Sequence, residues 1–150
     1  MSGWRYYPIS SLPSALDVVW CRFPLEEYPS VPASKCRPAL VRQTAVSEEG
    51  GKPEIEIVYG TSKLLKDQYP FDLFVEHVRD MNEAGLWQAT RFVLGKKAWL
   101  PWSEDFFVPG VGCPTPVIGR LPATYLKKLE IIMRFRDRLQ IDDQLSLDVR

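Results

Sequence analysis

Histidine, cysteine and net charge are all scarce in this chain of 150 residues. It has one histidine and three cysteines, and no two cysteines are spaced as a Cys-x-x-Cys zinc motif. We therefore expect no metal site and no cofactor. Cys21, Cys36 and Cys113 are odd in number and far apart, which does not fit the disulfide framework of a small secreted protein. We expect reduced thiols.

The chain also lacks an excess of positive charge and any long apolar run. Its 19 Lys and Arg residues balance its 19 Asp and Glu residues, whereas a protein that wraps duplex nucleic acid non-specifically is clearly basic. Any nucleic-acid site must therefore be local and built from a few placed cations. No stretch has the length of a membrane span, and the N-terminus does not have the pattern of a signal peptide. These features predict a cytoplasmic protein with no membrane partner.

What the chain does have is a series of short strand patterns followed by one helical pattern. Its length fits one domain, and its 45% apolar and 25% charged residues are ordinary for a globular protein. Alternating or β-branched segments bounded by turn residues predict strands. These strands are expected at residues 17–23, 38–46, 54–59, 71–75, 88–94, 97–102 and 116–121, and residues 77–84 predict a turn or a short helical piece.

The terminal helix is predicted at residues 122–141. Pro122 suits a helix start, and apolar residues then recur near one face. Residues 1–14 predict an irregular arm whose aromatic residues pack on the outside of the domain, and residues 142–150 a polar, frayed tail. The domain itself spans residues 15–141. Many short strands followed by one helix predict a mainly β fold, a small barrel closed by the helix.

Several short motifs occur in an informative order. They are DVVWCRF at 17–23, RPALV at 37–41 after a proline-rich loop, VYGTS at 58–62, AGL at 84–86 with Gln88, and VIGRLP at 117–122. In order and spacing, over about residues 15–135, they resemble the PemK/MazF family of toxin ribonucleases. Leu16 stands where that family usually has glycine, and residues 96–114 contain an insertion that has no counterpart in the pattern.

The resemblance implies an SH3-like β-barrel of the PemK/MazF/CcdB type, usually a homodimer. It implies the toxin of a type II toxin–antitoxin system, an mRNA interferase that cleaves single-stranded RNA without a metal and is restrained by an antitoxin protein. It also implies that Arg37 and Thr61 are the catalytic residues.

The chemistry of such a cleavage suits these two residues. The neighbouring 2′-hydroxyl attacks the phosphate, and the protein must supply positive charge and hydrogen-bond donors for the phosphoryl oxygens. The guanidinium of Arg37 matches phosphate oxygens, and Thr61 follows Gly60, where the backbone can approach a phosphate closely. Substrate-binding candidates, chosen for their proximity to the motifs, are Arg22, Lys35, Ser62, Lys63, Gln88 and Arg91. Tyr28 and Tyr69 are candidates for stacking on bases.

The sequence identifies no general base, because arginine stays protonated near neutral pH. The pattern favours a turn role for Asp17 and a solvated loop for Glu26 and Glu27, and His77 lies outside the motifs. This gap leaves open a non-catalytic binding module or a gyrase-targeting toxin of the same fold. A decayed or repurposed toxin that keeps only the barrel is a third hypothesis.

Overall fold

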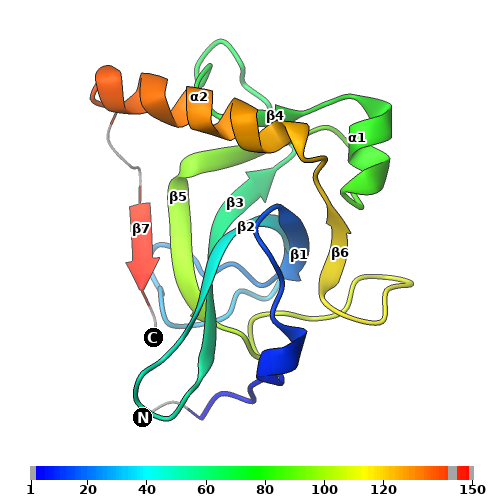
Figure 1. Ribbon diagram of the computed structural model, residues 1–150, viewed down its shortest axis with the longest axis vertical. Coiled ribbons are helices and arrows are strands. Elements are labelled where there is room, and N and C mark those ends of the chain that lie inside the picture. Colours follow the sequence, from blue (N-terminus) through cyan, green and yellow to red (C-terminus); the bar gives the residue numbers. More distant parts are fainter. Residues whose placement is uncertain (1–2, 142–144, 149–150) are drawn as a thin grey trace.

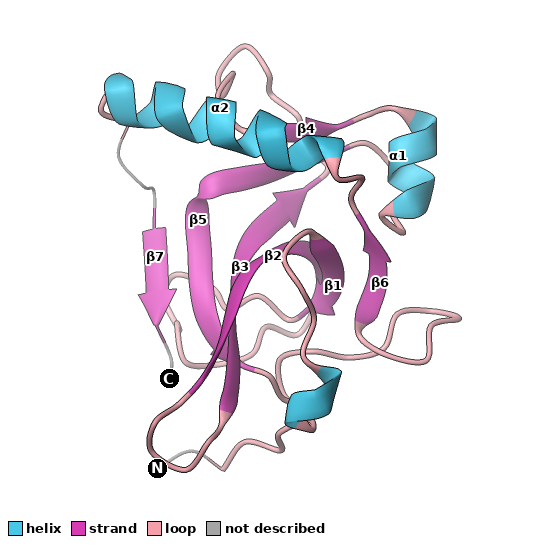
Figure 2. Cartoon of the chain, in the orientation of Figure 1, coloured by secondary structure: helices cyan, strands magenta, loops and turns pink. Residues whose placement is uncertain are grey.

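The computed structural model describes residues 3–141 and 145–148 and shows a curled antiparallel sheet with a helix across one end (Figure 1). Six strands follow the order β4-β5-β3-β2-β1-β6. They are β1 (Asp17–Cys21), β2 (Arg37–Val46), β3 (Pro53–Thr61), β4 (Leu73–Val75), β5 (Thr90–Pro101) and β6 (Val117–Arg120). The helical elements are a 3₁₀ turn at Ile9–Ser11, α1 (Val78–Glu83) and α2 (Thr124–Arg138) (Figure 2).

The predicted mainly β class with a C-terminal helix is confirmed, but one predicted break in the sheet is absent. The segments at 88–94 and 97–102 form the single strand β5. Its register against β3 jumps from Val58↔Lys97 to Tyr59↔Val93, so the residues around Gly95 form a bulge. Glycine in a strand often marks such a bulge, and here it bends the strand without ending it.

The prediction of a frayed tail is wrong for part of its length. Strand β7 (Leu145–Asp148) pairs in parallel with residues 96–99 of β5. The short β4 reaches only Thr90, Arg91 and Phe92 on β5, so the rest of that edge is open to another strand. Residues 142–144 and 149–150 of the predicted tail lie outside the described residues.

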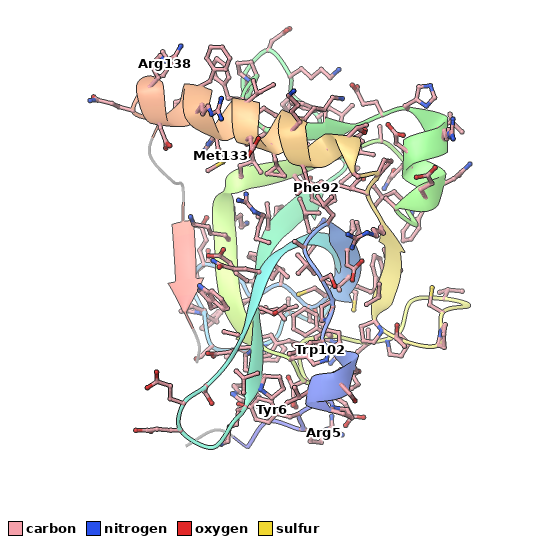
Figure 3. The ribbon with its side chains drawn as sticks, viewed as in Figure 1. Arg5, Tyr6, Phe92, Trp102, Met133 and Arg138 are labelled. Carbon is pink, nitrogen blue, oxygen red and sulfur yellow. The ribbon has the colours of Figure 1, made fainter. Side chains whose placement is uncertain are left out.

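Two hydrophobic clusters fill the two faces of the curled sheet. Strand alternation sends Leu40 to the cluster beneath α2 and its neighbours Ala39 and Val41 to the other. Figure 3 shows Phe92 near α2 and Trp102 toward the opposite end of the molecule. Because both clusters hold β2 and β3 from opposite sides, the ends of these strands are firmly positioned.

The N-terminal arm packs against the second cluster, as predicted for its aromatic residues. Trp4 meets Phe106 edge to face, with ring centroids 5.0 Å apart. The hydroxyl of Tyr7 donates a 2.7 Å hydrogen bond to the carbonyl of Phe107. Among the described residues, no helix combines the length and apolar character needed to cross a membrane.

Candidate functional site

A small cleft forms where the start of β2, the end of β3 and the loop after α1 meet. Its volume is about 120 Å³, and its lining includes Arg37, Thr61, Ser62 and Gln88. Three separate sequence motifs supply these four residues. The structure therefore brings together both predicted catalytic residues and two of the predicted substrate-binding residues.

Strand pairing and one glycine explain why these residues meet. Ala39 pairs with Tyr59 in the antiparallel β2–β3 ladder, so Arg37 and Thr61 come side by side two residues further along. A Cβ at Gly60 would lie 2.4 Å from the carbonyl oxygen of Pro38. Only glycine therefore permits β3 to approach the start of β2 this closely.

Arg37 is exposed at the mouth of the cleft. Its guanidinium carbon lies 5.6 Å from the ring centroid of Tyr59, a cation–π contact. Within the described part of the chain, no carboxylate lies at ion-pair distance from it. The guanidinium is thus held by its neighbour and remains able to bind an anion.

A second cation, Lys96, lies beside Arg37 and was missed by the sequence reasoning. Its ammonium sits over the same Tyr59 ring, 3.9 Å from the centroid. Burial lowers the pKa of Lys96; Glu26 and Glu27 raise that pKa, while Arg37 lowers it further. Lys96 falls in the stretch without a counterpart in the family pattern, and only the β3–β5 pairing reveals its position.

Thr61 is buried, and its side chain takes part in a local turn. Its Oγ1 accepts a 3.2 Å hydrogen bond from the backbone N–H of Lys63. This leaves the hydroxyl hydrogen available to an acceptor in the cleft. Ser62 and Lys63 are exposed, and Ser62 also lines the cleft.

Arg91 has a different position from the other candidates. It is buried, and its guanidinium donates to Asp72 at 2.7 Å and to the carbonyl of Lys63 at 2.9 Å. The ring of Tyr69, a candidate for base stacking, lies 4.4 Å from the guanidinium carbon. These contacts give Arg91 and Tyr69 a structural role, because they fix the segment that follows β3.

Arg22 and Lys35 do not line the cleft. Arg22 is half-buried beside Cys36, which does line it. Burial raises the pKa of the Cys36 thiol, and the neighbouring Arg22 guanidinium acts in the opposite direction. Lys35 is exposed on the loop that precedes β2.

Trp87 is a further cleft residue that the sequence reasoning missed. Its side chain is 70% exposed, although it lies between the buried Leu86 and the cleft residue Gln88. Trp20 holds its ring edge to face, with centroids 5.3 Å apart. The sequence did carry a sign of this role, because Trp87 is an aromatic residue between the AGL motif and Gln88.

His77 and Asp17, two of the side chains considered as bases, do not line the cleft. His77 precedes α1 and lines a separate hollow. Asp17 pairs with Arg120 at 3.0 Å. In the described ranges, no group of three or more His, Cys, Asp or Glu residues is arranged to hold a metal ion.

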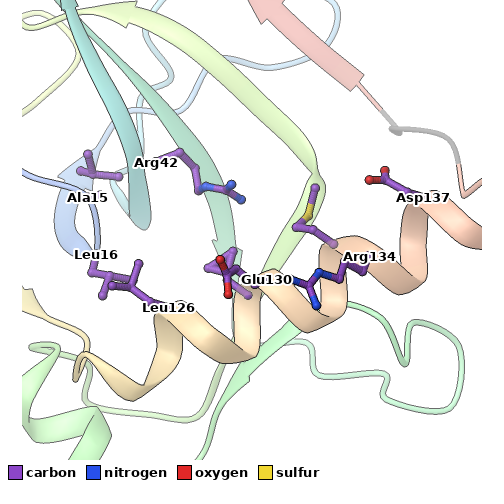
Figure 4. Close-up of a pocket in the computed structure, with 10 residues that line it drawn as sticks. Ala15, Leu16, Arg42, Leu126, Glu130, Arg134 and Asp137 are labelled. Atoms are coloured by element: carbon purple, nitrogen blue, oxygen red, sulfur yellow. The ribbon is translucent and has the colours of Figure 1, made fainter.

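A larger hollow of about 370 Å³ lies between α2, the residues just before β1 and the middle of β2 (Figure 4). Its floor includes the apolar Leu126, and its rim carries charges of both signs. The charged residues are Arg42, Glu130, Arg134 and Asp137. Because these charges offset one another, this hollow suits an anion less well than the cleft at Arg37 does.

The cleft thus combines an unpaired guanidinium, a hydroxyl and an amide on rigid strand ends and their adjoining loop. Such a set can bind a phosphodiester and stabilise negative charge that develops on its oxygens. Neither a protein-family model nor a curated protein matches this sequence.

Proposed function

We propose that this protein is a metal-free endoribonuclease that cleaves single-stranded RNA, the toxin of a type II toxin–antitoxin system on an SH3-like barrel of the PemK/MazF type. One observation carries the proposal. Arg37, the adjacent Thr61 and Ser62, and Gln88 come from three separate motifs and line one cleft. The motifs that resemble the toxin family therefore converge in space, as a shared active site requires.

The reaction forms a bond between the 2′-oxygen and phosphorus and breaks the bond from phosphorus to the 5′-oxygen. The products are a 2′,3′-cyclic phosphate and a 5′-hydroxyl. Arg37 neutralises the phosphoryl oxygens in the transition state, and the Thr61 hydroxyl donates a hydrogen bond to one of them. Lys96 adds positive potential beside Arg37.

Proton transfer is the weak part of this site. Among the described residues, no carboxylate or histidine lines the cleft. The 2′-hydroxyl proton therefore passes to water, and water returns a proton to the 5′-oxygen. A placed base contributes roughly 10²- to 10⁴-fold in rate, so we expect slow turnover.

The remaining polar residues act on binding in this proposal. Gln88 and Ser62 contact the nucleotide in the cleft, while Lys63 and Lys35 contact the RNA backbone at the rim. The proposed antitoxin would act at the same residue. Arg37 is exposed and unpaired, so an acidic segment of the antitoxin that bound over it would block the substrate. We further propose that the protein acts as a homodimer in the cytoplasm.

The test is cleavage of a long single-stranded RNA in EDTA by purified protein. We expect discrete fragments, and we expect Arg37→Ala to lower the rate by about 10²- to 10³-fold, as loss of a transition-state donor does. Arg42→Ala is the matched control, because Arg42 lies on the same strand but lines the hollow beneath α2. It should cleave within about threefold of the wild type.

Two results contradict the proposal. Folded wild-type protein that leaves several RNAs intact is not this enzyme, and the binding-module and gyrase-targeting hypotheses then come first. Equal cleavage by the wild type and Arg37→Ala would place the reaction at another site.

A further inference from the structure

We propose that the hollow beside Trp87 binds one nucleobase of the RNA, adjacent to the phosphate held at Arg37. This inference rests on the proposed function and adds a base-binding subsite to it.

The hollow borders the cleft. Trp20 and Trp87 line both, so the tryptophan pair stands at the boundary between them. On the far side of this pair the hollow has a volume of about 270 Å³. A nucleotide whose phosphate contacts Arg37 can therefore place a neighbouring base beyond the boundary without leaving the surface.

The hollow is apolar where the cleft is polar. Its lining includes Val111, Cys113 and Ile118, and none of its described lining side chains is charged. Val111 is fully exposed on the loop between β5 and β6 and lines the hollow together with the two tryptophans. An apolar slot beside an anion site matches a nucleotide, which has a flat apolar base attached to a charged backbone.

The floor of the hollow is rigid because the loop after α1 packs tightly on β6. Gly85 has φ +73°, and a Cβ there would lie 2.1 Å from the carbonyl oxygen of Ile118. A Cβ at Gly119 would lie 2.2 Å from the carbonyl carbon of Ala84. Figure 1 shows α1 and β6 side by side at this edge. Backbone contacts this close fix the start of the loop that carries Trp87.

The exposed ring of Trp87 points to stacking as the mode of binding. An indole that is 70% exposed leaves most of its apolar area in water. A base stacked on an aromatic side chain is worth about 1–3 kcal/mol. Trp20 contacts the ring edge to face, with centroids 5.3 Å apart, and this contact favours one orientation of the indole and so lowers the entropy lost on binding. Gln88, the next residue, carries an amide that can donate to and accept from a base edge.

The experiment measures binding without cleavage. A fluorescently labelled RNA carrying 2′-O-methyl groups cannot react, and its anisotropy gives Kd for each variant. We expect Trp87→Ala to raise Kd about tenfold or more, as loss of one stacked base predicts, and Trp87→Phe to retain most of the affinity. Phe135→Ala is the control, because Phe135 is a partly exposed aromatic on α2 that lines neither hollow.

A second arm locates the base. Abasic sites are placed one at a time along the same RNA. One position should weaken binding to the wild type by a similar factor yet leave Kd of Trp87→Ala unchanged, because the two changes remove the same contact.

The outcomes separate this inference from the ribonuclease proposal. If the wild type cleaves RNA and Trp87→Ala has the same Kd as the wild type, the subsite proposal is overturned and the ribonuclease proposal stands. If every abasic position weakens both proteins equally, Trp87 does not contact a base and the subsite is again overturned. If the wild type neither cleaves nor binds RNA, both proposals fail.

Discussion

At the scale of single residues, burial and partners separate two arginines that the sequence assigns to the site, Arg37 as catalytic and Arg91 as substrate-binding. Arg37 and Arg91 each sit at the start of a strand. Arg37 is exposed, whereas Arg91 is buried and paired with Asp72. A buried charge needs such a partner. The partner lies 19 residues away on a loop, so local sequence gave no sign of the pairing.

We therefore predict that Arg91→Ala lowers stability rather than acting directly on RNA. Removing one member of a buried ion pair costs about 3–5 kcal/mol. The value should fall near 3 kcal/mol, because Arg136 also approaches Asp72, at 3.5 Å. Urea unfolding followed by circular dichroism measures the change.

Lys63→Ala serves as the control for this prediction. Its side chain is exposed, so its unfolding free energy should stay within about 0.5 kcal/mol of the wild type. An Arg91→Ala protein of full stability with weakened RNA binding would return Arg91 to the substrate-binding group.

At the scale of elements, the close approach of β2 and β3 makes the cleft. The alternation at 54–59 predicts a strand, but it does not reveal that Gly60 lies against the backbone of Pro38. The same limit applies to β5 and β7. In the sequence, Gly95 predicts a break between two strands. Pairing with β3 instead makes the residues around it a bulge within the single strand β5.

We predict that Gly60→Ala destabilises the fold by about 1–3 kcal/mol, the usual cost of forcing extra atoms into a packed region. The new methyl group would meet the Pro38 carbonyl oxygen at 2.4 Å, and this backbone atom cannot rotate away. Thermal unfolding should show a lower Tm. Gly3→Ala is the control, because nothing lies within 4 Å of a Cβ there. Equal Tm values for the two variants would show that the strand ends are looser than described.

At the scale of the whole molecule, the sequence predicted those features of the fold and the site that depend on local sequence patterns. Alternation and helical periodicity gave the mainly β class with its terminal helix, and the motif resemblance selected four residues that share a cleft. Lys96 and Trp87 were missed because their roles depend on residues that only folding brings near. The curled sheet places Lys96 over Tyr59, and the packing of Trp20 holds Trp87 at the boundary between the hollows.

The balanced charge of the chain fits this arrangement. With 19 cationic and 19 acidic residues, the protein has no bulk attraction for nucleic acid. In the proposed function, affinity for RNA therefore comes from the placed cations Arg37 and Lys96 and from stacking at Trp87.

The most direct test of metal-free cleavage by the 2′-hydroxyl compares two substrates in EDTA. One is an RNA that the protein cuts at a mapped position. The other is the same RNA with a single 2′-deoxynucleotide on the 5′ side of that bond. The proposed mechanism predicts a cyclic phosphate and a 5′-hydroxyl from the RNA and no cut at the deoxy position, since the nucleophile is missing there. Continued cleavage at the deoxy position, or a 5′-phosphate on the product, would contradict it.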